Sequence, residues 1–344
     1  MKKHANIPIF IPHLGCPNDC VFCNQRSISG HMSFDESKVR FEIEEALSSI
    51  EKIGEIEEVE IAFFGGSFTG IDRSLMVYLL ETAHEYITAG RVDSIRLSTR
   101  PDYISEEILD ILEKYGVRNI ELGLQSMCDD VLLKSKRGHD SICAERACKM
   151  IKKRGFHLIG QMMIGLPGSD AQKELETARK ICSLGADGAR IYPTVIFYNT
   201  ELCEMAKRGE YQPLTNEDAV MRSKEVIKLL DKNGVPCIRV GLCASENLSS
   251  DEEVYGGANH SAIGELAMGE VFYDKMCALL EELSDEGEKN VVFFVPKGAT
   301  SKAVGQKKRN INRIKDKYFV KKHIKSVKIL EKNELIGYNI KMEF

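Results

Sequence analysis

The sequence lacks any hydrophobic run that approaches the roughly 18 apolar residues needed to cross a membrane. It also lacks the start of a secreted protein, because the apolar stretch from Ile7 to Leu14 is short, contains two prolines and has no small-residue cleavage site. Low-complexity tracts and internal repeats are absent as well. We therefore expect a soluble cytoplasmic protein without a membrane partner.

What the sequence does contain is typical of a folded domain. Hydrophobic residues make up 43% and charged residues 29% of its 344 positions. Eleven cysteines are an odd number, and in a reducing compartment a disulfide framework is not expected. Burial or metal binding should therefore explain them. Eight are scattered through apolar or helical surroundings, where a free thiol behaves as a small hydrophobe.

Strand-like and helix-like segments alternate along the first two thirds of the chain. This alternation predicts a parallel sheet whose crossovers are helices. The expected strands are 7–12, 59–64, 94–98, 119–124, 157–164 and 188–193, and the expected helices are 35–52, 74–89, 105–114, 141–153 and 171–184. In such folds the active site lies at the carboxyl ends of the strands.

The pattern changes after residue 193. We expect a loop through Tyr198 and residues 209–211, then a helix at 216–233 and a strand at 237–241. A boundary near residue 240 divides the chain into a core domain, 1–240, and a C-terminal α+β domain, 241–344. The expected elements of the second domain are a polar stretch at 245–253, a helix at 261–283, a strand at 291–295, a basic helix at 301–317 and a hairpin around Lys332 and Asn333.

Three cysteines lie within eight residues directly after the first expected strand, in the segment Gly15-Cys16-Pro17-Asn18-Asp19-Cys20-Val21-Phe22-Cys23-Asn24. The spacing Cys-X3-Cys-X2-Cys suits an iron–sulfur cluster, because a loop this short can hold three irons of a cubane and leave the fourth without a protein ligand. S-adenosylmethionine (SAM) can chelate such an open iron. One electron from the reduced cluster can then cleave SAM to a carbon radical.

Three other interpretations of these cysteines stay open at this point. A zinc site would need a fourth ligand, which His13 or His31 could provide. Cys20 and Cys23 alone could form a redox pair. Three buried, unligated thiols are the remaining possibility.

Further motifs follow the later strands, where a cofactor of such a fold would lie. Paired glycines, Gly65 and Gly66, end the second strand and allow the backbone to approach a ligand closely. Arg137 could bind a carboxylate as a planar donor, although Arg100 and Arg137 could instead be solvated surface charges. Met163 is either core or part of an apolar cofactor pocket.

With these segments the sequence resembles the radical SAM superfamily and, within it, the branch of the elongator catalytic subunit. The likeness covers residues 5–240 and rests on the cluster loop 15–25, Phe64 to Thr69, Thr99 to Asp102, Gln125-Ser126, Arg137 to His139 and Ile191 to Thr194. The resemblance implies an α/β fold, a partial (β/α)6 barrel that carries a [4Fe-4S] cluster and SAM at its top. It also implies an electron donor such as a flavodoxin or ferredoxin.

The resemblance assigns roles to individual residues. Cys16, Cys20 and Cys23 would ligate the cluster, and Phe22 would lie beside the adenine. Gly65 and Gly66 would face the methionyl amino group, and Gln125 and Arg137 the ribose and carboxylate. The other candidate SAM contacts are Ser67, Thr69, Arg100, Gln161, Met163 and Tyr192. No catalytic acid or base is assigned, although His13, His139 and His260 lie near motifs.

Two departures from the family limit the choice of substrate. Gln161 stands where oxygen-independent coproporphyrinogen oxidases have an acidic residue, which argues against haem synthesis. Elongator catalytic subunits carry an acetyltransferase domain after the radical domain, and the last hundred residues here offer no acetyl-CoA-binding pattern. Residues 259–266 instead resemble the C-terminal domain of shorter bacterial relatives.

The distribution of charge bears on the partner. Residues 297–328 contain twelve Lys and Arg and one acid, a net charge of +11, whereas the rest of the chain carries −16. Such a basic segment would attract the phosphates of tRNA or another RNA. We therefore expect a radical SAM enzyme that modifies an RNA base. The alternatives are a radical SAM oxidoreductase acting on a small molecule such as a tetrapyrrole, and a non-catalytic iron–sulfur protein.

Overall fold

A computed structural model describes residues 4–11, 14–16, 20–24, 34–54, 56–242 and 252–344. His13, His31 and the polar stretch 245–253 fall wholly or largely outside these ranges. Among the described residues no helix is both long and apolar enough to cross a bilayer.

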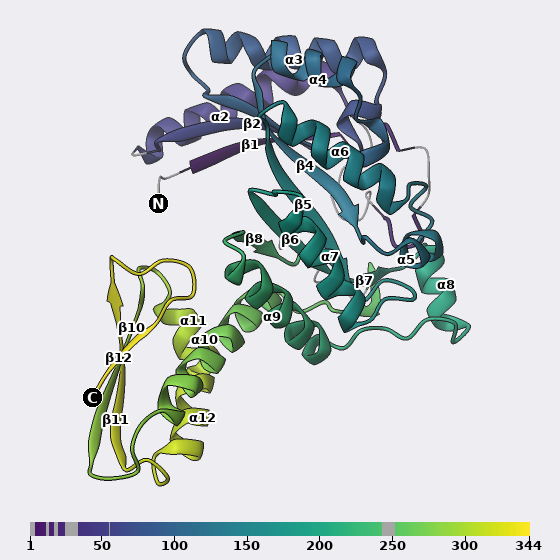
Figure 1. The fold of residues 1–344 in the computed structure, drawn as a ribbon. Coiled ribbons are helices and arrows are strands. Elements are labelled where there is room, and N and C mark those ends of the chain that lie inside the picture. The colour runs from purple at the N-terminus through teal and green to yellow at the C-terminus, as the bar shows by residue number, and fades with distance from the viewer. Residues whose placement is uncertain (1–3, 12–13, 17–19, 25–33, 55, 243–251) are drawn as a thin grey trace.

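A curled sheet of seven parallel strands forms the larger part of the molecule (Figure 1). Its order is β1 (His4–Ile11), β2 (Glu58–Gly65), β3 (Ser94–Thr99), β4 (Val117–Gln125), β5 (His157–Ile164), β6 (Gly188–Pro193) and β8 (Cys237–Val240). The predicted α/β partial barrel is confirmed. The strand expected at 237–241 pairs with β6 and so extends the same sheet by one strand.

Helices connect the strands and cover the outer face of the sheet (Figure 1). They are α2 (Val39–Ile53), α3 (Arg73–Thr88), α4 (Glu106–Lys114), α6 (Ser141–Lys153), α7 (Ala171–Ser183) and α9 (Asn216–Lys232). Side-chain caps fix several of their starts: Ser105 accepts a hydrogen bond from the Ile108 amide and Asp170 from the Lys173 amide. The apolar faces behind these caps build one continuous core.

The expected loop through Tyr198 is wrong in part. The chain forms a short strand, β7 (Val195–Phe197), which pairs antiparallel with β9 (Val254–Gly257), and then the helix α8 (Glu201–Lys207). A further short helix, α5 (Asp129–Lys134), follows β4. Elements this short contain too few residues to show a period, so the sequence pattern did not reveal them.

Charged side chains fill the concave side of the sheet, one from each of several neighbouring strands. Glu121 on β4 accepts hydrogen bonds from Arg96 on β3 (3.0 Å), Arg190 on β6 (2.7 Å) and Gln161 on β5 (2.8 Å). Glu60 on β2 binds Arg96 through two nitrogens, at 2.8 and 3.0 Å. Both carboxylates are almost fully buried. Because each is paired, neither carboxylate is an uncompensated buried charge.

The C-terminal region has a second core. A three-stranded sheet, in the order β11 (Ile324–Lys332), β10 (Lys289–Pro296) and β12 (Lys341–Glu343), packs against α10 (Ile263–Glu281), α11 (Thr300–Val304) and α12 (Arg309–Tyr318). The first half of α10 contributes to the larger core and its second half to this one. The boundary near residue 240 stays a prediction.

Two expectations for this region are wrong. The basic helix expected at 301–317 is divided, because Gly305 (φ 75°) ends α11, and Lys307 and Lys308 adopt left-handed backbone angles before α12 begins. The hairpin around Lys332 does not form, because β10 lies between β11 and β12. The connection after β11 is long enough to pass β10, and on the way the Tyr338 ring packs against Phe272 with 5.1 Å between ring centroids.

We predict that Glu121→Ala lowers the free energy of unfolding by about 3–5 kcal/mol, since Arg190 loses its carboxylate partner and Arg96 loses one of two. Glu113→Ala removes an exposed pair with Arg154 and should cost under about 1 kcal/mol. Urea unfolding of both variants measures the difference. Equal midpoints would contradict a structural role for the buried network.

Candidate active site

The cysteine segment lies at the carboxyl edge of the sheet, directly after β1. Cys20 is buried, and Cys16 and Cys23 are half-buried. Backbone hydrogen bonds fix the segment to its surroundings: the Cys23 amide donates to the Cys20 carbonyl at 2.9 Å, and the Val21 amide to the Ser135 carbonyl at 3.3 Å. Residues 17–19 lie outside the described residues. The three cysteines thus belong to one segment at the edge where this fold presents its chemistry.

The paired glycines at the end of β2 pack against this loop. The Gly66 amide donates to the Ile11 carbonyl at 2.8 Å, and a Cβ on Gly66 would lie 2.0 Å from the Leu14 carbonyl oxygen. Gly65 has φ 112°, which other residues rarely adopt. The close approach that the structure shows is therefore to the chain that leads into the cysteines. A contact of either glycine with SAM stays a prediction.

Two buried arginines stand beside the thiols. Arg137 donates from Nη1 to the Cys20 Sγ at 3.2 Å and from Nη2 to the Gly123 carbonyl at 2.7 Å. Arg100 donates to the Asp102 carboxylate at 2.9 Å and to the Arg137 carbonyl. Only 3% of Arg100 and 6% of Arg137 is exposed, so the interpretation of both as solvated surface charges is wrong.

The site carries surplus positive charge. Asp102 pairs with Arg100, but Arg137 has no carboxylate partner among the described residues. Arg100 Nη1 and Arg137 Nε are buried without a hydrogen-bond partner in the described structure. Burial raises the pKa of the Cys16 thiol, and the two arginines oppose that effect. A buried cation of this kind is costly unless an anion accompanies it, so the residues fit an anionic group such as a thiolate-ligated cluster or a carboxylate.

Hydroxyl groups join the β2 end to the β3 end behind the glycines. Thr99 Oγ1 lies 2.9 Å from Ser67 Oγ and 2.6 Å from Thr69 Oγ1, and Thr69 also donates to the Tyr103 carbonyl. Ser67 Oγ further accepts a hydrogen bond from the Arg100 amide at 3.3 Å. Ser67 therefore bonds the backbone of Arg100 directly, and Thr69 bonds the neighbouring Thr99.

The remaining candidates lie around this centre. Met163 on β5 and Tyr192 on β6 are register partners, half-buried side by side on neighbouring strands. Gln125 ends β4 with φ 64°, and its Oε1 is buried without a partner. Phe22 packs in a small cluster with Val21 that includes residues of β7 and α8. Gln161 belongs to the charged network of the barrel interior, where it donates to Glu121.

The described part of the chain has no site for a single metal ion, because no three of its His, Cys, Asp or Glu side chains converge. A [4Fe-4S] cubane does not require the three thiolates to converge on one point, because each binds a separate iron. The zinc interpretation depends on His13 or His31, which both lie outside the described residues.

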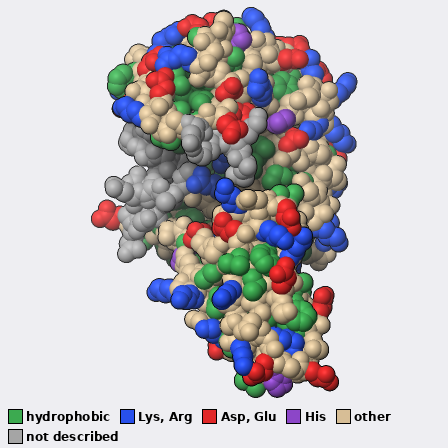
Figure 2. Space-filling view, turned by 90° about the vertical axis from the view of Figure 1, so that its left-hand side faces the viewer, with side chains coloured by type: hydrophobic (Ala, Val, Ile, Leu, Met, Phe, Trp, Pro, Cys, Tyr) green, Lys and Arg blue, Asp and Glu red, His purple; other side chains and the backbone are tan. Residues whose placement is uncertain are grey.

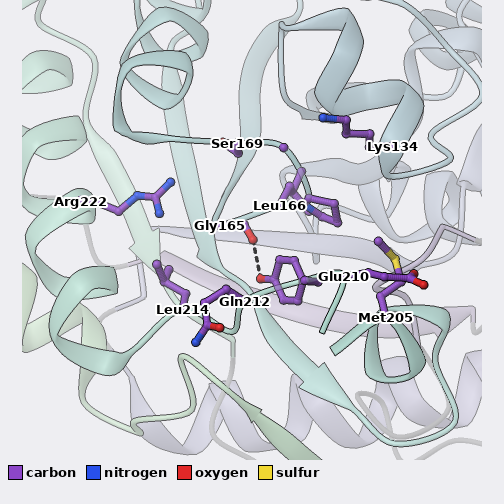
Figure 3. Close-up of a pocket in the computed structure, with 12 residues that line it drawn as sticks. Lys134, Gly165, Leu166, Ser169, Met205, Glu210, Gln212, Leu214 and Arg222 are labelled. Carbon is purple, nitrogen blue, oxygen red and sulfur yellow. Dashed lines mark hydrogen bonds between the residues drawn. The ribbon is translucent and has the colours of Figure 1, made fainter. Parts of the chain in front are cut away.

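A cavity of about 460 Å³ adjoins the loop after β5 (Figure 3). The Tyr211 hydroxyl donates to the Gly165 carbonyl at 2.5 Å, and buried Glu174 accepts hydrogen bonds from the Gly165 amide and from Arg222. None of the predicted cofactor contacts lines it. Residues 165–168 of its lining are contiguous in the sequence, but Tyr211 and Arg222 come from later segments that only the fold brings to them.

Comparisons with known proteins show the family of this chain. Residues 10–181 match the radical SAM superfamily and residues 186–271 the radical SAM C-terminal domain. An uncharacterised protein of Methanocaldococcus jannaschii, MJ0486, is 32% identical over 224 residues, which are 62% of this chain and 68% of that protein. A tRNA uridine(34) acetyltransferase of the same organism is 27% identical over 195 residues, which are 51% of this chain and 36% of that enzyme.

The fold also matches a solved structure. Archaeal Elp3 of Methanocaldococcus infernus, with an N-terminal deletion, superposes with a TM-score of 0.62 at 22% sequence identity, covering 81% of this chain and 64% of that one. This chain thus spans about a third of the curated acetyltransferase and under two thirds of the solved Elp3 chain.

The chain belongs to the radical SAM superfamily, whose enzymes use a [4Fe-4S] cluster and SAM, and it resembles the elongator branch as expected.

The tight contact at Gly66 yields a test of the loop. We predict that Gly66→Ala pushes the Leu14 carbonyl away, costs about 1–3 kcal/mol of stability and sharply lowers the iron retained after anaerobic reconstitution. Gly256→Ala is the matched control, because a Cβ there meets nothing within 4 Å and neither glycine has a positive φ. Equal iron contents in the two variants would show that the loop tolerates the displacement.

His139 yields a test of burial beside the arginines. Burial, and then the nearby charge of Arg137, lowers its pKa to about 4 from 6.5. Because the unfolded chain takes up this proton at a higher pH than the native chain, the contribution of a neutral His139 is present above pH 6.5 and is lost as the pH falls toward 4. We predict that apo wild type loses about 2 kcal/mol more stability than His139→Gln between pH 7 and pH 5. Parallel pH profiles in urea unfolding would contradict the buried neutral state.

Proposed function

We propose that this protein cleaves SAM reductively at a [4Fe-4S] cluster held by Cys16, Cys20 and Cys23, and uses the resulting radical to modify a base of tRNA. The observation that carries the first part is the contact of Arg137 with the Cys20 sulfur in a buried, positively charged site at the carboxyl edge of the sheet. When bound, the reduced cluster supplies the electron that splits SAM into methionine and a 5′-deoxyadenosyl radical.

The chain's own residues have definite tasks in this proposal. Arg137 and Arg100 offset the negative charge of the thiolates and offer buried, unpartnered N–H groups to the SAM carboxylate. Gln125, whose carboxamide oxygen is also unpartnered, accepts a hydrogen bond from the ribose. Met163 and Tyr192 present an apolar surface that excludes water from the reacting carbon.

The tRNA part of the proposal rests on one relative and on the basic segment. A relative that matches half of this chain is named for its action on tRNA uridine 34, and residues 297–328 are strongly basic. Six of the twelve cations of that segment pair with acids of α10 and the link that follows it: Arg309 and Arg313 with Glu270, Lys317 and Lys321 with Glu281, Lys322 with Asp285, and Lys325 with Glu288. The charge available to an RNA is therefore smaller than the count along the chain. A flavodoxin or ferredoxin of the cytoplasm would supply the electron.

We predict that anaerobically reconstituted protein with dithionite and SAM produces 5′-deoxyadenosine, and that Cys20→Ala does not. Cys182→Ala controls for loss of a thiol, because Cys182 is a half-buried residue of α7 away from the cysteine loop. Product is measured by chromatography, and iron and sulfide content confirm cluster loading.

A fully loaded cluster that yields no 5′-deoxyadenosine would overturn SAM cleavage and favour the non-catalytic alternative. The substrate is tested separately by deuterium transfer from base-deuterated tRNA into 5′-deoxyadenosine. Transfer from a deuterated tetrapyrrole, with none from tRNA, would overturn the tRNA assignment alone.

A further inference from the structure

The C-terminal sheet is covered by helices on one face only. Along β10, Val291, Phe293 and Val295 are fully buried against α10, α11 and α12. The alternate residues Val292 and Phe294 are only half-buried and point to the other side. Figure 1 shows no helix or strand of the described residues on that side of the sheet.

Strand register identifies the rest of this surface, which we call the open face. Lys328 of β11 lies opposite Val292, and Leu330 lies opposite Phe294. On β12, Lys341 is the partner of Phe294 and Glu343 the partner of Val292. Paired residues share a face. The open face therefore consists of Asn290, Val292, Phe294, Ser326, Lys328, Leu330, Lys332, Lys341 and Glu343.

The chemistry of the open face is an aromatic ring surrounded by lysines. The Lys332 Nζ lies 5.3 Å from the centroid of the Phe294 ring, and Leu330 beside it is 48% exposed. Lys332 and Lys341 share the exposed carboxylate of Glu334, and Lys328 makes no ion pair within the described residues. Figure 2, which looks onto this side of the molecule, shows hydrophobic side chains on the lower lobe with Lys and Arg and several acidic side chains around them.

We propose that the open face binds single-stranded RNA, with a base stacked on Phe294 and the phosphates on either side of it near Lys328 and Lys332. Single-stranded RNA is bound where an aromatic ring on an exposed sheet offers stacking and cations follow the backbone. The lysines match the phosphate charge and the ring matches the base, whereas an apolar partner chain would leave the lysines desolvated. The inference rests on the proposed tRNA function and names the surface that would hold the substrate.

This surface differs from the basic segment considered as a whole. Half of the cations of 297–328 are paired within the C-terminal region, and the paired residues of α12 contact α10 or the link after it. Lys328 is the member of that segment that lies on the open face, and Lys332 and Lys341 come from outside it. Aromatic and cationic groups thus meet on this face of the sheet.

The test is fluorescence anisotropy of full-length protein with a labelled single-stranded RNA 12-mer of mixed sequence, and with a tRNA transcript. We expect Phe294→Ala to weaken binding about tenfold or more, because stacking on one base is lost, and Phe294→Tyr to restore it. Phe41→Ala, which removes a phenylalanine of α2 that is 68% exposed and lies outside the open face, is the control and should leave the Kd unchanged. Lys328→Gln should lower the slope of log Kd against log salt by about 1, and Lys52→Gln should not.

Several results would overturn the proposal: no RNA binding by wild type at low salt, an unchanged Kd for Phe294→Ala, or equal weakening by Phe41→Ala. If wild type binds no RNA but binds a peptide or anionic vesicles in a way that Phe294→Ala abolishes, the face belongs to that partner instead. The two proposals fail separately. If the protein makes no 5′-deoxyadenosine but binds RNA in a way that depends on Phe294, the RNA-binding surface is supported and SAM cleavage is not. If it makes 5′-deoxyadenosine but its RNA binding does not depend on Phe294, only the proposed surface is wrong.

Discussion

The site depends on the hydrogen bonds of the Arg137 guanidinium. One of its nitrogens reaches the Cys20 sulfur and another the Gly123 carbonyl at the end of β4, while Arg100 from the end of β3 bonds the Arg137 carbonyl. The cysteine loop is thereby joined to two strands that lie far from β1 in the sequence. Because a buried cation without an anion is unfavourable, the same contacts that position the loop also favour a negatively charged occupant.

Buried charges are paired within the chain in the barrel interior, whereas at the candidate active site one buried charge is left unpaired among the described residues. In the interior, Glu60 and Glu121 are matched by arginines from the neighbouring strands, so the network is balanced within the chain. At the carboxyl edge, Asp102 balances Arg100 and leaves Arg137 unmatched among the described residues. The balanced network can therefore stabilise the fold without a ligand. The unbalanced site gains most from a bound anion, which suggests that cluster loading also stabilises this edge of the sheet.

Sequence reasoning succeeded where a signal repeats along the chain and failed where it depends on distant residues. The strands His157–Ile164 and Gly188–Pro193 and the helix Ser141–Lys153 form as expected, since each is a long periodic segment with clear ends. The burial of Arg137 could not be read locally, because Cys20 lies 117 residues away. The hairpin failed for a related reason: only the pairing of β10 with both β11 and β12 excludes it.

Counting charge along a segment is a poor guide to the field that a partner meets. Six of the twelve cations of residues 297–328 pair with acids of α10 and of the link after it, and these pairs neutralise that part of the charge. Attraction of RNA then depends on where unpaired lysines lie beside a group that a base can contact. Strand alternation places Lys328 and Phe294 on one face, and it separates both from Val291 and Phe293 in the core. Selectivity for single-stranded over duplex RNA would follow from this arrangement, because only an unpaired base exposes the ring face that Phe294 can stack on.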